Sequence, residues 1–493
     1  MKSLGIDIGS SSIKVSLMDI TTGECVASAT NPKVEMKIDV EQSGWAEQDP
    51  QMWWNYICDG IKEISTTYTL QDVKAIGITY QMHGLVMLDK DCHVLRKSII
   101  WCDSRAVEIG AKAFNDLTPE YCLEHLLNSP GNFTASKLAW VKNNEPEIFK
   151  QAAHILLPGD YIAYLLSGNI STTVSGLSEQ ILWDFKNNTR ADKLIEYYGV
   201  SSELYPEAGT SIGELAATNE YIETLFGIPK GTPISYRAGD QPNNAFSLNV
   251  MEAGEIAATG GTSGVVYGVV DKLQCDKLSR VNPFVHVNHN MNDPHYGILL
   301  CINGTGIMNS WMKKIAAKDI DYAEINNIAA EAPVGSDGLV IIPFGNGAER
   351  VLENKYPGTI ISGIDLNRHT QAHLLRAAQE GIAFAFKYGI DIMKEMGLNP
   401  SVIRAGEANM FLSPLFRETL ATITDARIEL FNTDGSLGAA RGAALGAGLY
   451  KNREEAFASL TLQKVVEPKL EDKEALDVAY KKWLKTLNLT INS

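Results

Sequence analysis

The chain has 493 residues, which is more than one ordinary hydrophobic core accommodates, so we expect more than one domain. Hydrophobic residues make up 45% and charged residues 21%, which is the balance of a globular protein. The formal net charge of −16 argues against a nucleic-acid partner, because a phosphate backbone binds a basic surface, whereas a single nucleotide needs only local backbone N–H groups.

The first predicted element is a hairpin. Apolar residues alternate along residues 4–8, the small residues Gly9, Ser10, Ser11 and Ser12 supply a tight turn, and the alternation resumes over residues 13–17. Small residues let backbone N–H groups approach an anion, and Asp7, just before the turn, could hold Mg²⁺ through water. The alternative is an ordinary hairpin with an Asp-stabilised turn.

Helix and strand signals alternate over the next stretch, which indicates an α/β protein. Asp49 followed by Pro50 predicts a helix start, because Asp caps helices and Pro is tolerated at their first position. Strands are predicted over residues 73–79 and 84–88, and helices over residues 136–143 and 161–166.

Polar side chains that suit a sugar follow two of these strands. Gln81 and His83 could hydrogen-bond sugar hydroxyls while Met82 covers an apolar face; the alternative is a loop histidine without a partner. Asp103 lies between Trp101 and Arg105, a combination typical of polyol recognition and also of salt-bridged loops.

Asp240 follows the predicted strand over residues 232–236, in a loop formed by residues 237–242. A carboxylate there could accept the proton of an attacking hydroxyl, since phosphoryl transfer needs a base in position more than a strong base. The alternative is a turn Asp ahead of a helix that opens at Pro242.

The pattern of the opening hairpin recurs about 250 residues later: residues 256–259 run into the small-residue turn 260–264, and residues 265–267 lead away. Aligning Gly9 with Gly261 places Ser10 opposite Thr262. The repeat predicts two similarly built lobes, residues 1–250 and 251–493, whose two turns would clamp the phosphates of a nucleotide; a chance recurrence of a common turn is the alternative.

The C-terminal half carries three further patterns. Glycine and alanine dominate residues 438–448, which predicts a closely packed helix, and residues 467–487 predict an amphipathic surface helix. His286, His289 and His295 could suggest a metal, but their spacing within a polar segment favours a solvated loop.

The seven cysteines form no CxxC pair, so we expect neither a disulfide framework nor a zinc ribbon, in keeping with a reducing cytosol. Asp7 interrupts the first short apolar segment, which excludes a signal peptide, and no apolar run reaches the roughly 18 residues of a spanning helix. We therefore expect a soluble cytoplasmic protein with no membrane partner.

Eight segments, taken in order from Gly5 to about Gly448, resemble the FGGY carbohydrate kinases of the actin–hexokinase superfamily. Each motif is weak alone, and their order is what makes the resemblance specific. The segments are GIDIGSS (5–11), WAEQDP (45–50), QMHG (81–84), WCDSR (101–105), FTASKL (133–138), LPGDY (157–161), GD (239–240) and GTSG (261–264).

The resemblance implies two actin-like, ribonuclease H-like lobes that close around ATP and a sugar. It implies transfer of the γ-phosphoryl group of ATP-Mg²⁺ to the terminal hydroxyl of a ketose, with D-xylulose as the favoured substrate. In this reaction Asp240 would be the general base, and Asp7 would hold Mg²⁺ through water. It also implies sugar contacts from residues 81–83 and Asp103, and a homodimer is common in the family. The implied nucleotide contacts are Gly9, Ser10, Ser11, Gly261, Thr262, Gly304, Gly306, Gly406 and Asn409.

Three departures from the family pattern leave the sugar and the nucleotide affinity open. Gln241 stands where xylulose-specific members have Asn, residues 405–408 replace a Gly-Gly-Gly-Ala loop, and residues 348–352 replace Gly-Glu-Arg-Thr-Pro. One alternative is a kinase of the same family for ribulose, fuculose, gluconate or glycerol. The others are a catalytically silent sugar- or nucleotide-binding regulator and an actin-like filament or chaperone ATPase, which the sugar-side motifs do not favour.

Overall fold

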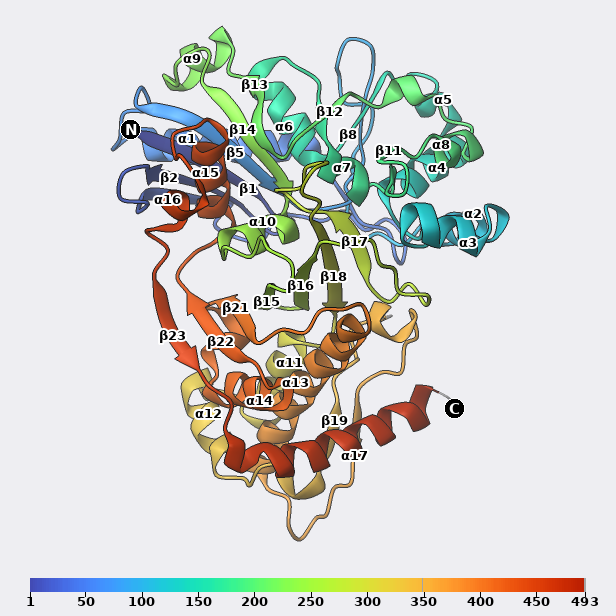
Figure 1. Cartoon of the computed structure of the whole chain (residues 1–493), viewed down its shortest axis with the longest axis vertical. Coiled ribbons are helices and arrows are strands. Elements are labelled where there is room, and N and C mark those ends of the chain that lie inside the picture. Colours follow the sequence, from blue (N-terminus) through green and yellow to red (C-terminus); the bar gives the residue numbers. More distant parts are fainter. Residues whose placement is uncertain (348, 492–493) are drawn as a thin grey trace.

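The computed structural model describes residues 1–347 and 349–491, and it shows an α/β protein built on two large sheets (Figure 1). Ala348, which opens one of the departing segments, and residues 492–493 of the second predicted lobe lie outside the described residues. Within the described ranges, no helix combines the length and apolarity needed to cross a membrane.

The first sheet has six strands in the order β13-β14-β5-β1-β2-β3. β1 and β2 form the predicted opening hairpin, with Ile8 opposite Ile13, and β5 and β14 extend the sheet in parallel from β1. The strands are β1 (Lys2–Ile8), β2 (Ile13–Asp19), β3 (Cys25–Asn31), β5 (Val73–Tyr80), β13 (Ile212–Ala217) and β14 (Pro233–Gly239).

The second sheet has seven strands in the order β17-β18-β16-β15-β21-β22-β23. The predicted second hairpin is confirmed as β15 paired with β16. The strands are β15 (Ile256–Gly260), β16 (Gly264–Val270), β17 (Asn282–Val285), β18 (Tyr296–Ile302), β21 (Val402–Gly406), β22 (Arg427–Phe431) and β23 (Leu462–Val466).

The two sheets share one plan. In each, an antiparallel meander (β1-β2-β3 or β15-β16-β18) is extended from its first strand by two parallel strands (β5-β14 or β21-β22) and an antiparallel edge strand. The common order confirms the prediction of two actin-like, ribonuclease H-like lobes.

Two helices cover opposite faces of the first sheet. Val15 of β2 lies against α1 (Pro50–Ser65), and its neighbour Ser16 hydrogen-bonds Ser436 of α15 (Gly435–Gly446) at 2.7 Å, because adjacent strand residues point to opposite faces. The predicted Asp49 cap is confirmed, since its carboxylate accepts the N–H of Gln51 at 2.9 Å.

The predicted small-residue helix is confirmed as α15, and it returns the chain to the first lobe (Figure 1). A Cβ at Gly5 or Gly77 would overlap a backbone carbonyl oxygen of α15, so this contact requires glycine on the strands. β1 and β5 therefore touch the helix backbone directly, although more than 350 residues separate each of them from α15 in sequence.

The long insertion between β5 and β14 builds the outer part of the first lobe. The predicted strand 84–88 begins two residues later than expected, and both predicted helices are present with extra residues at their ends. The insertion contains β6 (Val86–Leu88), β7 (Ser98–Ile99), β8 (His154–Leu156), α2 (Val107–Asp116), α3 (Pro119–Tyr121), α4 (Thr134–Asn144), α5 (Pro146–Phe149), α6 (Pro158–Ser167), α7 (Val174–Glu179), α8 (Asp192–Tyr197) and α9 (Glu220–Phe226).

The segment around Asp240 differs from its prediction. The expected loop 237–242 does not exist, because β14 runs to Gly239 and α10 (Asp240–Ser247) begins at the next residue. Gly239 has the extended backbone of a residue that precedes a helix (φ −57°, ψ 157°). Asp240 therefore sits in the first turn of a helix, directly at the end of a sheet strand.

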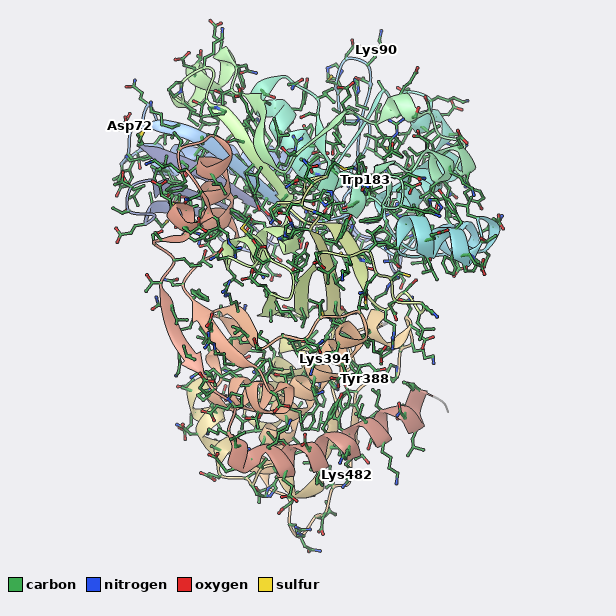
Figure 2. The ribbon with its side chains drawn as sticks, in the orientation of Figure 1. Asp72, Lys90, Trp183, Tyr388, Lys394 and Lys482 are labelled. Carbon is green, nitrogen blue, oxygen red and sulfur yellow. The ribbon has the colours of Figure 1, made fainter. Side chains whose placement is uncertain are left out.

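Helices pack around the second sheet, with α13 at their centre. The predicted C-terminal surface helix is confirmed as α17, whose Trp483 is buried and donates its indole N–H to the carbonyl of Ile341 at 3.0 Å. Lys482, the residue before it, is labelled in Figure 2 and donates to the carbonyl of Gly338. These helices are α11 (Gly306–Ala316), α12 (Tyr322–Ala330), α13 (Gln371–Glu395), α14 (Pro414–Thr424) and α17 (Lys473–Ile491).

Candidate active site

Three carboxylates converge at one edge of the first sheet. β1 and β14 run parallel to β5 between them, so Asp7 near the end of β1 and Asp240 just past β14 reach the same edge, and Asp434 caps α15 beside them. Burial first, and then the charges of Asp240 and Asp434, raise the pKa of Asp7 to about 7, against the lowering effect of Lys14. Burial also raises the pKa of Asp240 to about 6, against hydrogen bonds from Gln241.

This carboxylate group carries more negative charge than its surroundings neutralise. Lys14 pairs with Asp434 at 2.6 Å, and among the described residues no cation forms an ion pair with Asp7 or Asp240. A Cβ at Gly435 would overlap Oδ2 of Asp7, so the glycine leaves room for the carboxylate. Hard oxygen donors with surplus negative charge suit the Mg²⁺ ion that accompanies a nucleotide.

A hydrogen-bond chain holds the first small-residue turn. The amide of Gln48 donates to the carbonyl of Ser10 at 2.7 Å, and Gln81 donates to Gln48 at 3.0 Å. The indole of Trp101 reaches the Ser10 hydroxyl at 3.3 Å, and the N–H of Gly9 closes the turn on Ser12. Gln81 thus supports the turn that contains Gly9, Ser10 and Ser11.

The second small-residue turn borders a pocket of about 420 Å³. The N–H of Gly306 donates to the carbonyl of Gly261 at 2.9 Å, and that of Ile307 donates to Thr262 at 3.1 Å, so the turn is tied to the N-terminus of α11. A Cβ at Gly306 would overlap the Gly261 carbonyl oxygen. Pocket and helix N-terminus together suit a nucleotide, because helix N-termini attract phosphate.

Of the candidate nucleotide contacts in this lobe, Gly261, Thr262, Gly306 and Asn409 line the pocket. Gly304 is not part of the lining: its N–H donates to Glu349 at 3.1 Å, and a Cβ added there would overlap the Pro343 carbonyl oxygen. Gly406 ends β21 and is not part of the pocket lining.

The sequence analysis missed further polar residues that line this pocket, namely Asn309, Ser310, Tyr322 and Asn326. Asn309 and Ser310 stand three and four residues after Gly306, so they share its face of α11. The sequence shows that spacing directly. Tyr322 and Asn326 reach the pocket through the packing of α12, which the sequence does not show.

The sugar-side residues lie where the two lobes meet. His83 packs edge-on against Phe133 of the first lobe at 5.1 Å between ring centroids, and against Phe284 of β17 at 5.7 Å. Met82 lies beside Gly239, the residue before Asp240. The structure therefore places Met82 against the residue that precedes Asp240, although the two come from separate segments.

The protonation of His83 follows from its surroundings. Burial, with the nearby charges of Lys137 and Arg350, lowers its pKa to about 3, so the imidazole is neutral. Nδ1 stands 2.7 Å from the carbonyl oxygen of Glu179, which only accepts, so the proton is on Nδ1. Nε2 is therefore an acceptor, suited to a substrate hydroxyl.

Asp103 is placed differently from the other sugar-side candidates. Its side chain is fully buried, and its carboxylate accepts the N–H of Ala46 at 2.6 Å and a two-pronged contact from Arg105. The guanidinium of Arg105 stacks on Trp45 at 3.8 Å. Asp103 holds the 101–105 loop in place through these internal contacts.

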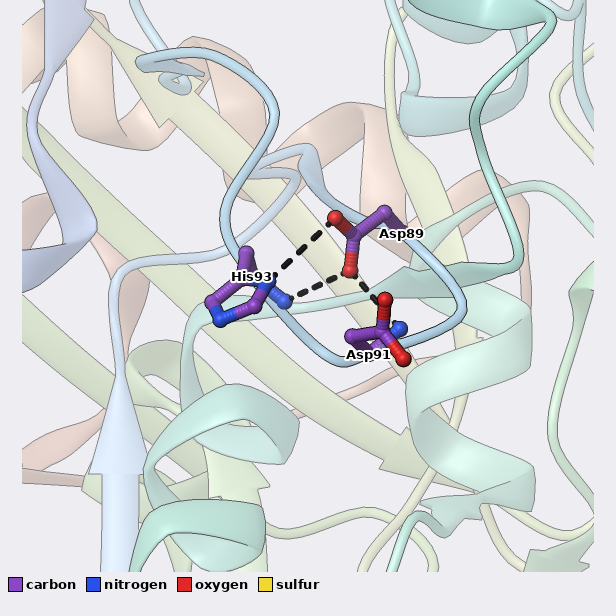
Figure 3. A group of neighbouring side chains, drawn as sticks. All are labelled: Asp89, Asp91 and His93. Atoms are coloured by element: carbon purple, nitrogen blue, oxygen red, sulfur yellow. Dashed lines mark hydrogen bonds and ion pairs between the residues drawn. The ribbon is translucent and has the colours of Figure 1, made fainter.

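Two clusters with possible metal ligands are explained by local structure. Asp89, Asp91 and His93 form an exposed turn in which Asp89 accepts the N–H groups of the other two at 2.9 Å (Figure 3). The solvated loop predicted for the three histidines 286, 289 and 295 is wrong: His286 and His295 are buried, and His286 hydrogen-bonds the Tyr267 hydroxyl at 3.0 Å.

The protein has two ribonuclease H-like lobes. Acids lie at the edge of one sheet, and a nucleotide-sized pocket lies beside the glycine turn of the other. This arrangement defines a phosphotransferase of the actin-like class. The model of the FGGY family of carbohydrate kinases, N-terminal domain, matches residues 3–247, and the C-terminal domain model matches residues 256–449. The chain belongs to the FGGY family, and it is a carbohydrate kinase.

Curated relatives match along nearly the full chain. The xylulose kinase of Bacillus subtilis (strain 168) is 28% identical over 467 residues, 92% of this chain and 89% of that protein. The xylulose kinase of Escherichia coli (strain K12) is 27% identical over 466 residues, 94% of this chain and 93% of that protein.

Solved structures share the fold. The ligand-bound xylulose kinase from Lactobacillus acidophilus superposes with a TM-score of 0.91 at 23% identity, covering 99% of this chain and 98% of that one. A gluconate kinase from the same organism gives a TM-score of 0.91 at 23% identity, covering 100% and 98%. The same fold thus serves different sugars.

Proposed function

We propose that this carbohydrate kinase transfers the γ-phosphoryl group of ATP-Mg²⁺ to the terminal hydroxyl of D-xylulose, with Asp240 as the general base. The observation that carries the proposal is the placement of Asp240 at the same sheet edge as Asp7, with Met82 packed against Gly239, the residue before Asp240. The names of the relatives support D-xylulose as the sugar.

Asp240 has the position and the acidity that the reaction needs. With a pKa of about 6, its carboxylate is ionised at neutral pH and basic enough to accept a proton from a hydroxyl. The freed oxygen forms a bond to the γ-phosphorus while the bond to the bridging oxygen breaks, and ADP leaves. This in-line displacement depends mainly on alignment.

The second acid, Asp7, has a supporting role in the proposal. It would hold the Mg²⁺ of the nucleotide through water, with the turn of Gly9, Ser10 and Ser11 and the turn of Gly261 and Thr262 on the phosphates. The metal would neutralise charge that develops on the transferring group. Lobe closure would exclude water and so prevent wasteful hydrolysis of ATP.

The proposal is tested by coupled ADP release from the purified protein with ATP-Mg²⁺ and a panel of D-xylulose, D-ribulose, L-fuculose, D-gluconate and glycerol. We expect saturable turnover with the highest kcat/KM for D-xylulose. Asp240→Ala should lower kcat by about a thousandfold or more while sugar affinity changes little. If another sugar gives a higher kcat/KM than D-xylulose, that sugar is the preferred substrate. If folded protein binds ATP but turns over none of the sugars, a catalytically silent regulator is favoured.

A further inference from the structure

One buried acid beside the sugar-side residues has no assigned role. Glu179 ends α7, and its side chain is only 2% exposed. Its backbone carbonyl accepts the hydrogen bond from His83. Its Oε2 and the Cγ of Met82 both stand 2.6 Å from the point where a Cβ of Gly239 would lie. The carboxyl therefore lies among His83, Met82 and the residue that precedes Asp240.

The carboxyl has hydrogen-bonding capacity left over. Its neighbour is the hydroxyl of Tyr80, which interacts with it as a hydrogen bond, and no other side chain among the described residues is within ordinary hydrogen-bond geometry of Oε1. A carboxyl group has several acceptor positions, so one contact leaves others for a ligand. A sugar presents hydroxyl groups that can donate to them.

The surroundings of Glu179 favour the protonated form of its carboxyl. Burial, and then the charges of Asp160 and Asp240, raise its pKa well above the usual range. The neighbouring cations are engaged elsewhere: Lys137 donates to the carbonyls of His83 and Ile100, and Arg237 pairs with Asp160 at 3.0 Å. A neutral carboxyl both donates and accepts hydrogen bonds, which a carboxylate cannot do.

We propose that Glu179 is a sugar-binding residue, whose carboxyl hydrogen-bonds a hydroxyl or carbonyl oxygen of the substrate and favours an uncharged ketose over a sugar acid. The inference rests on the proposed function and sharpens its substrate class. A sugar acid would bring its carboxylate close to Glu179 and Asp240, where the negative charge of Asp240 repels it.

The experiment measures the Kd of D-xylulose by isothermal titration calorimetry, without nucleotide, for wild type, E179L and E179Q. We expect Kd to rise at least tenfold in E179L, since the hydrogen bond is lost, and less in E179Q, since an amide also donates and accepts. The KM for ATP should stay within twofold in both variants. D-gluconate should bind wild type at least tenfold more weakly than D-xylulose.

A matched control separates contact from support. Y80F removes the hydroxyl beside Glu179 and leaves the carboxyl, so its Kd should stay within threefold of wild type. The same Kd measurements are made with D-ribulose and 1-deoxy-D-xylulose, which misplace or lack one oxygen of D-xylulose. If that oxygen is the one that Glu179 binds, the E179L substitution should weaken the binding of this sugar less than it weakens the binding of D-xylulose. A purely structural Glu179 would instead weaken every sugar equally and lower the melting temperature alongside.

The outcomes are distinguishable. If wild type binds D-xylulose and both Glu179 variants bind it equally well, or if the loss is the same for every sugar, the inference is overturned and the proposed function stands. Equal affinity of wild type for D-gluconate and D-xylulose overturns the selectivity. If wild type binds none of the sugars, the proposed function fails and the inference fails with it.

Discussion

The pH dependence of the sugar step follows from the environment of Asp240. Burial raises its pKa to about 6. A general base works only when ionised, so the ionised fraction is ~90% at pH 7, ~50% at pH 6 and ~10% at pH 5, one decade per unit below the pKa. Activity should therefore fall on the acidic side and level off above pH 7.

The assay is kcat/KM for D-xylulose between pH 4.5 and 8.5 at saturating ATP-Mg²⁺. Saturating metal keeps Asp7 ionised, because a divalent cation stabilises its carboxylate, so the profile reports Asp240. Asp240→Asn, which cannot ionise, should show a low and flat residual rate. A wild-type plateau that extends down to pH 4.5 would refute the reasoning, because it would mean that the base has an ordinary acidity.

Three further substitutions test separate parts of the structure. Gly306→Ala places a Cβ on the Gly261 carbonyl, so the KM for ATP should rise at least about tenfold with the sugar Kd unchanged, as kinetics and calorimetry would measure. Gly435→Ala pushes against Asp7, so kcat should fall at least about tenfold and the Mg²⁺ requirement should rise; an unchanged Mg²⁺ titration would remove Asp7 from the metal site. Trp483→Ala empties a buried position in α17 and should cost about 3–5 kcal/mol of unfolding free energy, read by denaturant titration, and a loss under 1 kcal/mol would contradict the packing described.

The elements that were predictable are those whose signals are local. Both hairpins were found because apolar alternation and a small-residue turn sit within about fifteen residues of each other. The start of α1 was found because Asp49 caps it through a side chain two residues from its partner. These features depend on short-range geometry, which a sequence displays directly.

The features that were missed depend on distant parts of the chain. The small residues of α15 predicted close packing, but nothing in them says that the partner is the sheet of the first lobe. Asp240 was expected in a loop because Pro242 resembles a helix start, whereas the helix begins at Asp240 itself, directly after the last residue of β14. Glu179 reaches His83 and Gly239 only through folding, so its sequence context gave no signal.

The sugar-side residues illustrate the limit of motif matching. His83 lies where the two lobes meet and Met82 precedes it, while the sugar contacts that the resemblance implied for both stay a prediction. Asp103, from an equally good motif, has its carboxylate engaged by Ala46 and Arg105 inside the protein. A motif identifies residues that a family uses, and the fold decides whether each faces the ligand or supports the residues that do.

The central claim is best tested by incubating the purified protein with ATP-Mg²⁺ and D-xylulose and following the mixture by ³¹P NMR. The account predicts one phosphate monoester on the terminal carbon of the sugar for each ADP formed, and no such signal with Asp240→Ala. Formation of ADP with only free phosphate, or a phosphorylated sugar from the Asp240→Ala variant at the wild-type rate, would contradict it.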